Sequence, residues 1–118
     1  MKKVLVFAVA AATGLLAMST TASAFSTKRC QACHAIDHVK IGPAWKDVVA
    51  AYKTPDTLAK VFKDGFPVSE RKIASTQDKF KHKAGLMTGQ FNNLIKGHED
   101  DAAKALFATV KNNKFGDY

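Results

Sequence analysis

The chain has 118 residues with 18 lysines and arginines against 10 acidic residues, which gives a formal net charge of +8. A chain of this length supports one domain with a small core. Its basic character fits an acidic protein partner, an anionic membrane surface or nucleic acid. Nucleic acid is excluded as the expected partner, because Arg29 and Arg71 are the only arginines and no run of basic residues is interleaved with aromatic ones.

Residues 1–24 have the pattern of a secretory signal peptide. Lys2 and Lys3 precede an apolar run from Val4 to Met18, and the stretch ends in Ala22-Ser23-Ala24, a small-x-small cleavage site. The apolar run has about 15 residues, fewer than the roughly 20 of a spanning helix, so an uncleaved anchor is the lesser alternative. Removing these 24 residues from 118 leaves a single domain of 94 residues, 25–118, and removing two lysines lowers the net charge from +8 to +6.

Two helices are predicted before residue 53. The first runs from Phe25 to about Ala35, with Ser26 and Thr27 available to cap it. Gly42 and Pro43 then interrupt regular structure. Pro43 opens the second helix, whose apolar face has helical spacing and consists of Trp45, Val48, Val49 and Tyr52.

A third helix is predicted between Thr54 and Gly65. Thr54 is its cap, Pro55 occupies its first turn, and glycine ends it. From Phe66 to Gly97 the periodicity is poor and glycines recur, so we expect a loop with at most one helical turn around residues 90–95. A loop of that length is unusual in a small domain unless it wraps a ligand.

The last predicted helix runs from Glu99 to about Asn113. Three acidic residues stand at its positive end, and its apolar stripe consists of Ala103, Leu106, Phe107 and Val110. No segment has the alternating, β-branched pattern of a strand. The expected fold class is therefore all-α.

Cys30, Cys33 and His34 match C-x-x-C-H, the attachment signature of c-type haem. On a helix, positions i and i+3 face the same way, so both thiols can reach the two vinyl groups on one side of a porphyrin. The next residue then presents its imidazole to the iron from that side. The pattern predicts one covalent haem c.

Two alternatives use the same residues. A disulfide between Cys30 and Cys33 leaves the histidine unexplained, and a thioredoxin-like motif needs a preceding strand that the sequence lacks. A zinc site from Cys30, Cys33, His34 and His38 has suitable ligand types, but four ligands within nine residues cannot easily surround a tetrahedral ion.

Three segments resemble successive parts of the small bacterial class I cytochromes c, which are single-haem periplasmic electron carriers. They are FSTKRCQACHAIDHVKIGPAWKDVVAAY, LAKVFKDG and DDAAKALFATVKN, about half of the mature chain. The resemblance implies four to five short helices wrapped around one covalent haem. It also implies that His34 is the proximal iron ligand, that a methionine is the distal one, and that the Pro43 carbonyl accepts the Nδ1 proton of His34.

Met87 is the expected distal ligand, because Met1 and Met18 leave with the signal. We place Met87 in the flexible, glycine-rich loop. Core packing is the alternative role for a lone methionine. His82 and His98 are competing ligands, whereas His38 is too near the proximal ligand. Trp45 and Tyr52 are candidates for the haem environment, although both also suit ordinary core packing.

Upstream of Met87 lies a basic segment, which we expect near the haem edge. Its cations would guide the protein to acidic redox partners, or else serve solubility alone; they are Arg71, Lys72, Lys79, Lys81, His82 and Lys83.

The expected function is electron transfer by a periplasmic monomer with no enzymatic activity, and transient docking at a membrane surface is compatible with it. The alternatives are a five-coordinate or bis-histidine haem protein that binds a gas or reduces peroxide, and a sensor or subunit module.

Overall fold

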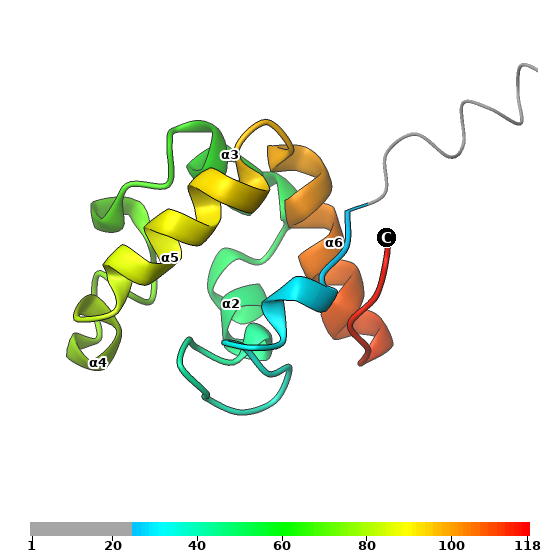
Figure 1. Cartoon of the computed structure of the whole chain (residues 1–118), viewed down its shortest axis with the longest axis horizontal. Helices are drawn as coiled ribbons and strands as arrows, with labels where there is room; N and C mark the ends of the chain where they lie inside the picture. Colours follow the sequence, from blue (N-terminus) through cyan, green and yellow to red (C-terminus); the bar gives the residue numbers. More distant parts are fainter. Residues whose placement is uncertain (1–24) are drawn as a thin grey trace, which may run out of the picture.

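The computed structural model describes residues 25–118, and this part of the chain contains five α-helices and no sheet (Figure 1). The helices are α2 (Trp45–Tyr52), α3 (Pro55–Lys63), α4 (Asp78–Lys81), α5 (Ala84–Gln90) and α6 (Glu99–Asn112). Two 3₁₀ turns, η1 (Lys28–Cys30) and η2 (Val68–Glu70), and a π-helical turn, η3 (Phe91–Ile95), complete the secondary structure. The predicted all-α class is confirmed.

The predicted signal, residues 1–24, lies outside the described residues. Within residues 25–118, none of the helices combines the length and the apolar character needed to cross a bilayer.

The predicted first helix is wrong, because residues 25–35 form no continuous helix: the 3₁₀ turn η1 is followed by one further hydrogen-bonded turn at Cys30–His34. Thr27 precedes this turn without capping it; its hydroxyl instead lies 2.8 Å from that of Thr109 on α6 and accepts a hydrogen bond from the Gly116 amide at 3.0 Å. Ser26 pairs with Asp117 in an isolated antiparallel bridge. The N-terminal segment is therefore extended along the C-terminal tail (Figure 1).

Helices α2 and α3 form where the sequence predicts them. The Thr54 hydroxyl accepts the Thr57 amide at 3.2 Å and Pro55 is the first residue of α3, as expected of a capped helix start. Gly65, with φ of 95°, follows the end of α3, in a conformation that favours glycine. The predicted boundaries of α3 are confirmed, and α2 begins at Trp45, two residues after the predicted Pro43.

The predicted loop between residues 66 and 97 is wrong over α4 and α5, whereas the helical turn predicted around residues 90–95 is present as η3. Helix α5 runs directly into η3, where the Lys96 amide donates to the Phe91 carbonyl at 2.9 Å and closes a π turn. The combined rod crosses the molecule from α4 to the loop before α6 (Figure 1). Met87 therefore lies on a helix rather than on a flexible loop.

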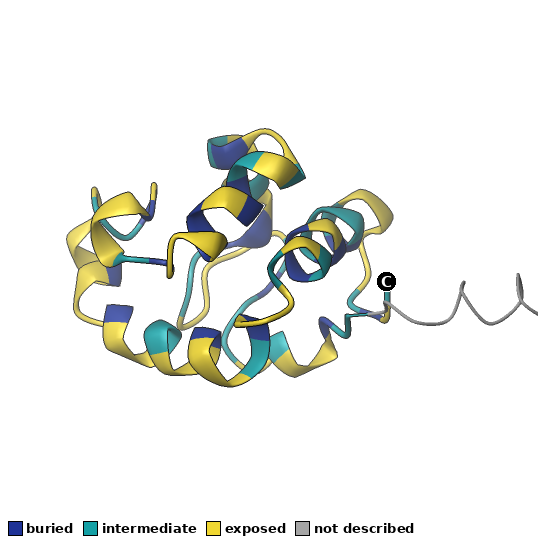
Figure 2. Ribbon diagram, turned by 90° about the horizontal axis from the view of Figure 1, so that it is seen from above, coloured by how far each residue is buried: buried dark blue, intermediate teal, exposed yellow. Residues whose placement is uncertain are grey.

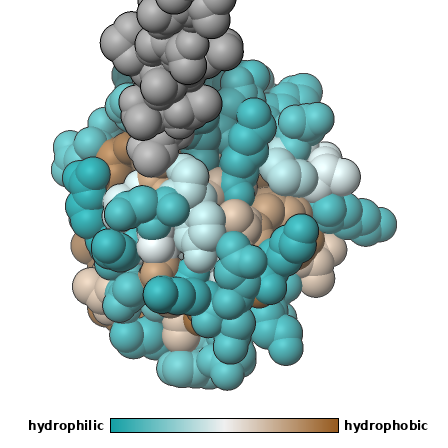
Figure 3. All heavy atoms as spheres, turned by 90° about the vertical axis from the view of Figure 1, so that its right-hand side faces the viewer, coloured by the Kyte–Doolittle hydropathy of each residue, from teal (hydrophilic) through white to brown (hydrophobic). Residues whose placement is uncertain are grey.

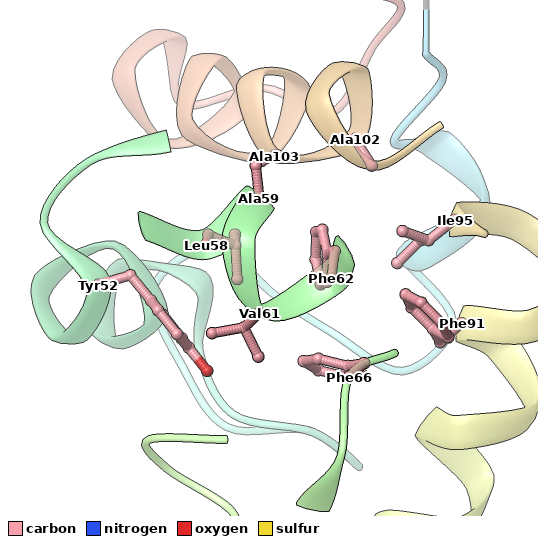
Figure 4. Close-up of a cluster of buried hydrophobic side chains, with 10 residues drawn as sticks. All are labelled: Tyr52, Leu58, Ala59, Val61, Phe62, Phe66, Phe91, Ile95, Ala102 and Ala103. Carbon is pink, nitrogen blue, oxygen red and sulfur yellow. The ribbon is translucent and has the colours of Figure 1, made fainter. Parts of the chain in front are cut away.

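Helix α6 begins and ends close to its predicted boundaries, and its predicted stripe faces the core but is only partly buried. Ala102, Ala103, Ala105 and Thr109 are buried, whereas the larger apolar residues of the predicted stripe are half-buried. Small residues allow α6 to approach α3 closely, and Ala103 meets Ala59 there (Figure 4).

The core cluster lies between α3, α6 and the rod of α5 and η3. Three aromatic rings meet in it: Phe62 and Phe66 have centroids 5.1 Å apart, and Phe91 lies 5.4 Å from Phe66 (Figure 4). Buried residues lie on the facing sides of the helices and exposed residues on their outer sides (Figure 2).

Candidate functional site

A largely apolar pocket lies beside this core, with a cavity volume of about 230 Å³. Its walls include Cys30, Cys33 and His34 from the N-terminal segment and Met87 from α5. The structure thus brings the C-x-x-C-H residues and the sequence-predicted distal ligand to the lining of one pocket, although they lie far apart in the chain.

Cys30 and Cys33 are held by one tight turn that follows from η1. The Cys33 amide donates to the Cys30 carbonyl at 3.2 Å, and the His34 amide donates to the same carbonyl at 3.0 Å. Both cysteines are free thiols and half-buried. Burial raises the pKa of the Cys30 thiol to about 11.

The His34 imidazole is fixed by a backbone carbonyl. Its Nδ1 lies 2.9 Å from the Pro43 oxygen, which is the hydrogen bond that the family resemblance implies. Burial is the main effect on this ring and lowers the pKa of His34. A neutral imidazole that donates from Nδ1 leaves the Nε2 lone pair available to a metal.

Gly42 packs against the same imidazole. A Cβ atom at this position would stand 2.8 Å from Nδ1 and 2.9 Å from Nε2 of His34, closer than real Cβ contacts allow. The Gly42 amide also donates to the Cys33 carbonyl at 2.8 Å, which ties this turn to the cysteine pair. Glycine is therefore required by the position of the ring rather than by its own backbone angles.

Trp45 lies between the histidine and the C-terminal tail. Its ring centroid is 5.6 Å from that of His34 and 5.0 Å from that of Phe115. Trp45 is 4% exposed and lines the pocket, so it belongs both to the core and to the wall of the site.

Met87 differs from the competing histidines in its position. It is half-buried and lines the pocket, whereas His38, His82 and His98 are exposed and are not part of the pocket wall. His38 pairs with its neighbour Asp37, with His38 Nδ1 and the carboxylate 2.8 Å apart. Among residues 25–118, no three His, Cys, Asp or Glu side chains are grouped so that they could hold a metal ion.

Two polar residues, Tyr52 and Arg71, also line the pocket wall. The Tyr52 hydroxyl accepts the Lys72 amide at 3.1 Å and keeps its own proton available for donation. Arg71 is only 4% exposed. The prediction that Arg71 belongs to the solvent-exposed basic segment is therefore wrong.

In the sequence, only the residue type indicates that Arg71 is buried. Arg71 is an arginine among lysines, and its planar fork suits burial better than an ammonium group does.

The four lysines of the basic segment are exposed, as the sequence predicts, and only Lys83 also borders the pocket. Leu86, on the first turn of α5, is 67% exposed and lies on the pocket wall, so apolar surface accompanies this charge. Elsewhere, the face that contains the C-terminal tail is mostly hydrophilic (Figure 3).

The chain matches no protein-family model, no curated protein and no solved structure.

Proposed function

We propose that the protein is a periplasmic electron carrier that binds one covalent haem c through Cys30, Cys33, His34 and Met87. The observation that carries the proposal is the shared pocket: a C-x-x-C-H turn, an imidazole with Nδ1 bonded to a carbonyl, and a thioether line the same apolar cavity. The resemblance of three segments to class I cytochromes c supports the same conclusion.

The volume of the pocket also favours a bound apolar group. The wall is formed mainly by apolar side chains, whose exposure to water in an empty pocket of about 230 Å³ is unfavourable. An apolar occupant would replace this exposure with dispersion contacts to the pocket wall.

Each site residue has a separate task in this proposal. Cys30 and Cys33 would form the two thioethers, and His34, oriented by Pro43 and Gly42, would bind iron through Nε2. Met87 would bind iron through its thioether sulfur. When bound, haem supplies an iron that cycles between ferric and ferrous states and so carries one electron.

His34 and Met87 would both serve as iron ligands, and neither would bind or activate a substrate. The apolar wall would exclude water and, with the thioether, favour the reduced state. These residues support electron transfer without an enzymatic step.

The exposed lysines would select the partner. Lys72, Lys79, Lys81 and Lys83 form a basic segment before Met87, and Leu86 adds apolar surface. Such a surface fits brief contact with an acidic redox protein. We expect the electron-transfer rate with an acidic partner to fall with ionic strength, and less so after all four lysines are changed to Gln. The control is a protein with Lys104→Gln and Lys111→Gln on exposed positions of α6; an equal loss of salt dependence there would remove the basic segment from docking.

The central test is a mass and a spectrum of the protein after export from a host that attaches haem c. The expected mass is that of the processed chain plus one haem, and the oxidised spectrum should contain the weak near-infrared thioether-to-iron band. Met87→Ala should abolish this band and open the reduced protein to carbon monoxide, whereas His82→Ala and His98→Ala should retain it. A colourless product with the bare polypeptide mass would refute the proposal. Rapid binding of carbon monoxide by the unaltered protein would favour the five-coordinate alternative.

A further inference from the structure

We propose that Arg71 is a positioning residue that fixes helix α5, and with it Met87, against the pocket. The inference rests on the proposed function of Met87. It identifies a residue outside the C-x-x-C-H turn and outside the ligand set as a determinant of how firmly the thioether is held.

The Arg71 guanidinium joins two segments of the chain. Nε and Nη2 both donate to the Phe66 carbonyl, at 3.1 and 2.8 Å. On the other side, Nη1 donates to the Ala84 carbonyl at 3.0 Å, and Nη2 donates to the Thr88 hydroxyl at 2.6 Å. Ala84 is the first residue of α5, Thr88 lies one turn further, and Met87 stands between them.

The segment at Phe66 is shaped to receive this group. Phe66 is a non-glycine residue with φ of 54°, a conformation that costs free energy and persists only where neighbouring contacts impose it. The guanidinium carbon also lies 4.0 Å from the centroid of the Phe66 ring. Phe66 itself packs in the core against Phe62 and Phe91, so Arg71 connects α5 to a rigid support.

The charge of Arg71 is stabilised by neutral hydrogen-bond acceptors rather than by a carboxylate. Among residues 25–118, its polar contacts are two carbonyls and one hydroxyl, and it takes part in none of the ion pairs. A buried cation costs several kcal/mol unless its donors are satisfied, so such a group constrains its acceptors strongly. Breaking this network would leave a buried charge, and α5 would have to move to relieve it.

Helix α5 depends on this support because its own sequence is weak. It has seven residues, two of them glycine, and no side-chain cap at its start. Isolated helices this short are unstable in water. The contacts from Arg71 hold its first turn, which otherwise would fray and carry Met87 away from the pocket.

The test compares Arg71→Lys, Arg71→Gln and Thr88→Val with the unaltered holoprotein. Lysine keeps the charge but cannot bond to both segments, and valine removes one acceptor while keeping the side-chain shape. The control is Thr54→Ala, which weakens α3 by removing its cap and leaves α5 untouched. Carbon monoxide binding to the reduced protein and amide hydrogen exchange in residues 84–90 are the two readouts, with residues 99–112 as the internal reference.

Both Arg71 variants should bind carbon monoxide about tenfold faster or more, because a lost charged hydrogen bond of about 1.5–3 kcal/mol corresponds to at least that factor. Exchange in residues 84–90 should rise by a similar factor while residues 99–112 change little, and Thr88→Val should show the same pattern more weakly. Thr54→Ala should change neither the rate of carbon monoxide binding nor the exchange of residues 84–90 relative to residues 99–112.

Unchanged ligand binding and unchanged exchange in residues 84–90 of Arg71→Lys would overturn the inference. If the unaltered protein already binds carbon monoxide rapidly, the methionine ligation fails instead, and the exchange comparison still decides whether Arg71 holds α5. If the Arg71 variants fail to mature, Thr88→Val decides by the same two readouts.

Discussion

Replacing Gly42 by alanine places a methyl group where the His34 ring lies. The added carbon would stand 2.8 Å from Nδ1 and 2.9 Å from Nε2, and the ring is already held at 2.9 Å from the Pro43 carbonyl. Relief requires the imidazole to turn or the segment 42–43 to shift. Either movement weakens the Nδ1 hydrogen bond that orients Nε2.

The magnitude follows from two contributions. Overpacking by one methyl group costs about 1–3 kcal/mol, and the hydrogen bond to Pro43 contributes about 1 kcal/mol. We therefore expect Gly42→Ala to lower the free energy of unfolding by about 2–4 kcal/mol. This is a large part of the stability of a small domain.

The assay is denaturant unfolding of the holoprotein, followed by the fluorescence of Trp45, the single tryptophan of the chain. Gly85→Ala and Gly89→Ala are matched controls. Both glycines lie within α5, where a Cβ atom would meet nothing within 4 Å. Because alanine favours a helix over glycine, each control should raise stability by about 0.5–1 kcal/mol.

Two outcomes of this comparison would contradict the predicted effect of the contact between residue 42 and His34. If Gly42→Ala is as stable as the unaltered protein and has the same iron-ligand spectrum, then the ring does not depend on the absence of a side chain at residue 42. If all three alanine variants lose the same stability, the effect belongs to glycine in general and not to the contact with His34.

Three further predictions concern stability. Thr109→Val should cost about 1–3 kcal/mol by leaving the buried Thr27 hydroxyl with one partner fewer, and a double-mutant cycle with Thr27→Val should show coupling in chemical unfolding. Thr54→Ala should cost about 1 kcal/mol in the same assay through loss of the α3 cap, and no loss would contradict that role. Burial raises the pKa of Tyr52, so its phenol stabilises the fold below a pH of about 10, and this contribution is lost as pH rises through the folded pKa. Tyr52→Phe should therefore flatten the alkaline decline in stability, and an unchanged alkaline slope would contradict the raised pKa of Tyr52. The same variant should cost about 1 kcal/mol at neutral pH, because the Lys72 amide loses its acceptor.

The helices that the sequence predicts correctly are those with their own local signals. Helix α3 has a threonine cap, a proline in its first turn and a glycine after its end, and α6 begins with three acidic residues. Helix α2 has a clear apolar face, of which Trp45 and Tyr52 are buried. In each case the signals that predict the helix are local, so the pattern alone is sufficient to locate it.

Helix α5 was missed because its support is not local. Gly85 and Gly89 argue against a helix on propensity, and the contacts that hold its first turn come from Arg71, thirteen residues before Ala84. The first predicted helix fails for the opposite reason. Thr27 is a good cap in isolation, but its hydroxyl bonds to Thr109 and Gly116 instead. Tertiary contacts decide both segments, and a single sequence does not record them.

The pocket and the core share side chains, so one substitution can affect both. Tyr52, Leu58, Phe62, Phe66 and Ile95 belong both to the core cluster and to the pocket wall. A group held in the pocket would therefore complete the packing of the core and stabilise the native state through these contacts. Thioether bonds would keep the haem attached after unfolding, so its effect on stability would not depend on haem concentration. The effect would come from native contacts and from restriction of the unfolded chain. A substitution in this shared wall should change iron ligation and unfolding together, whereas one at the contact of Ala59 with Ala103 should change unfolding alone.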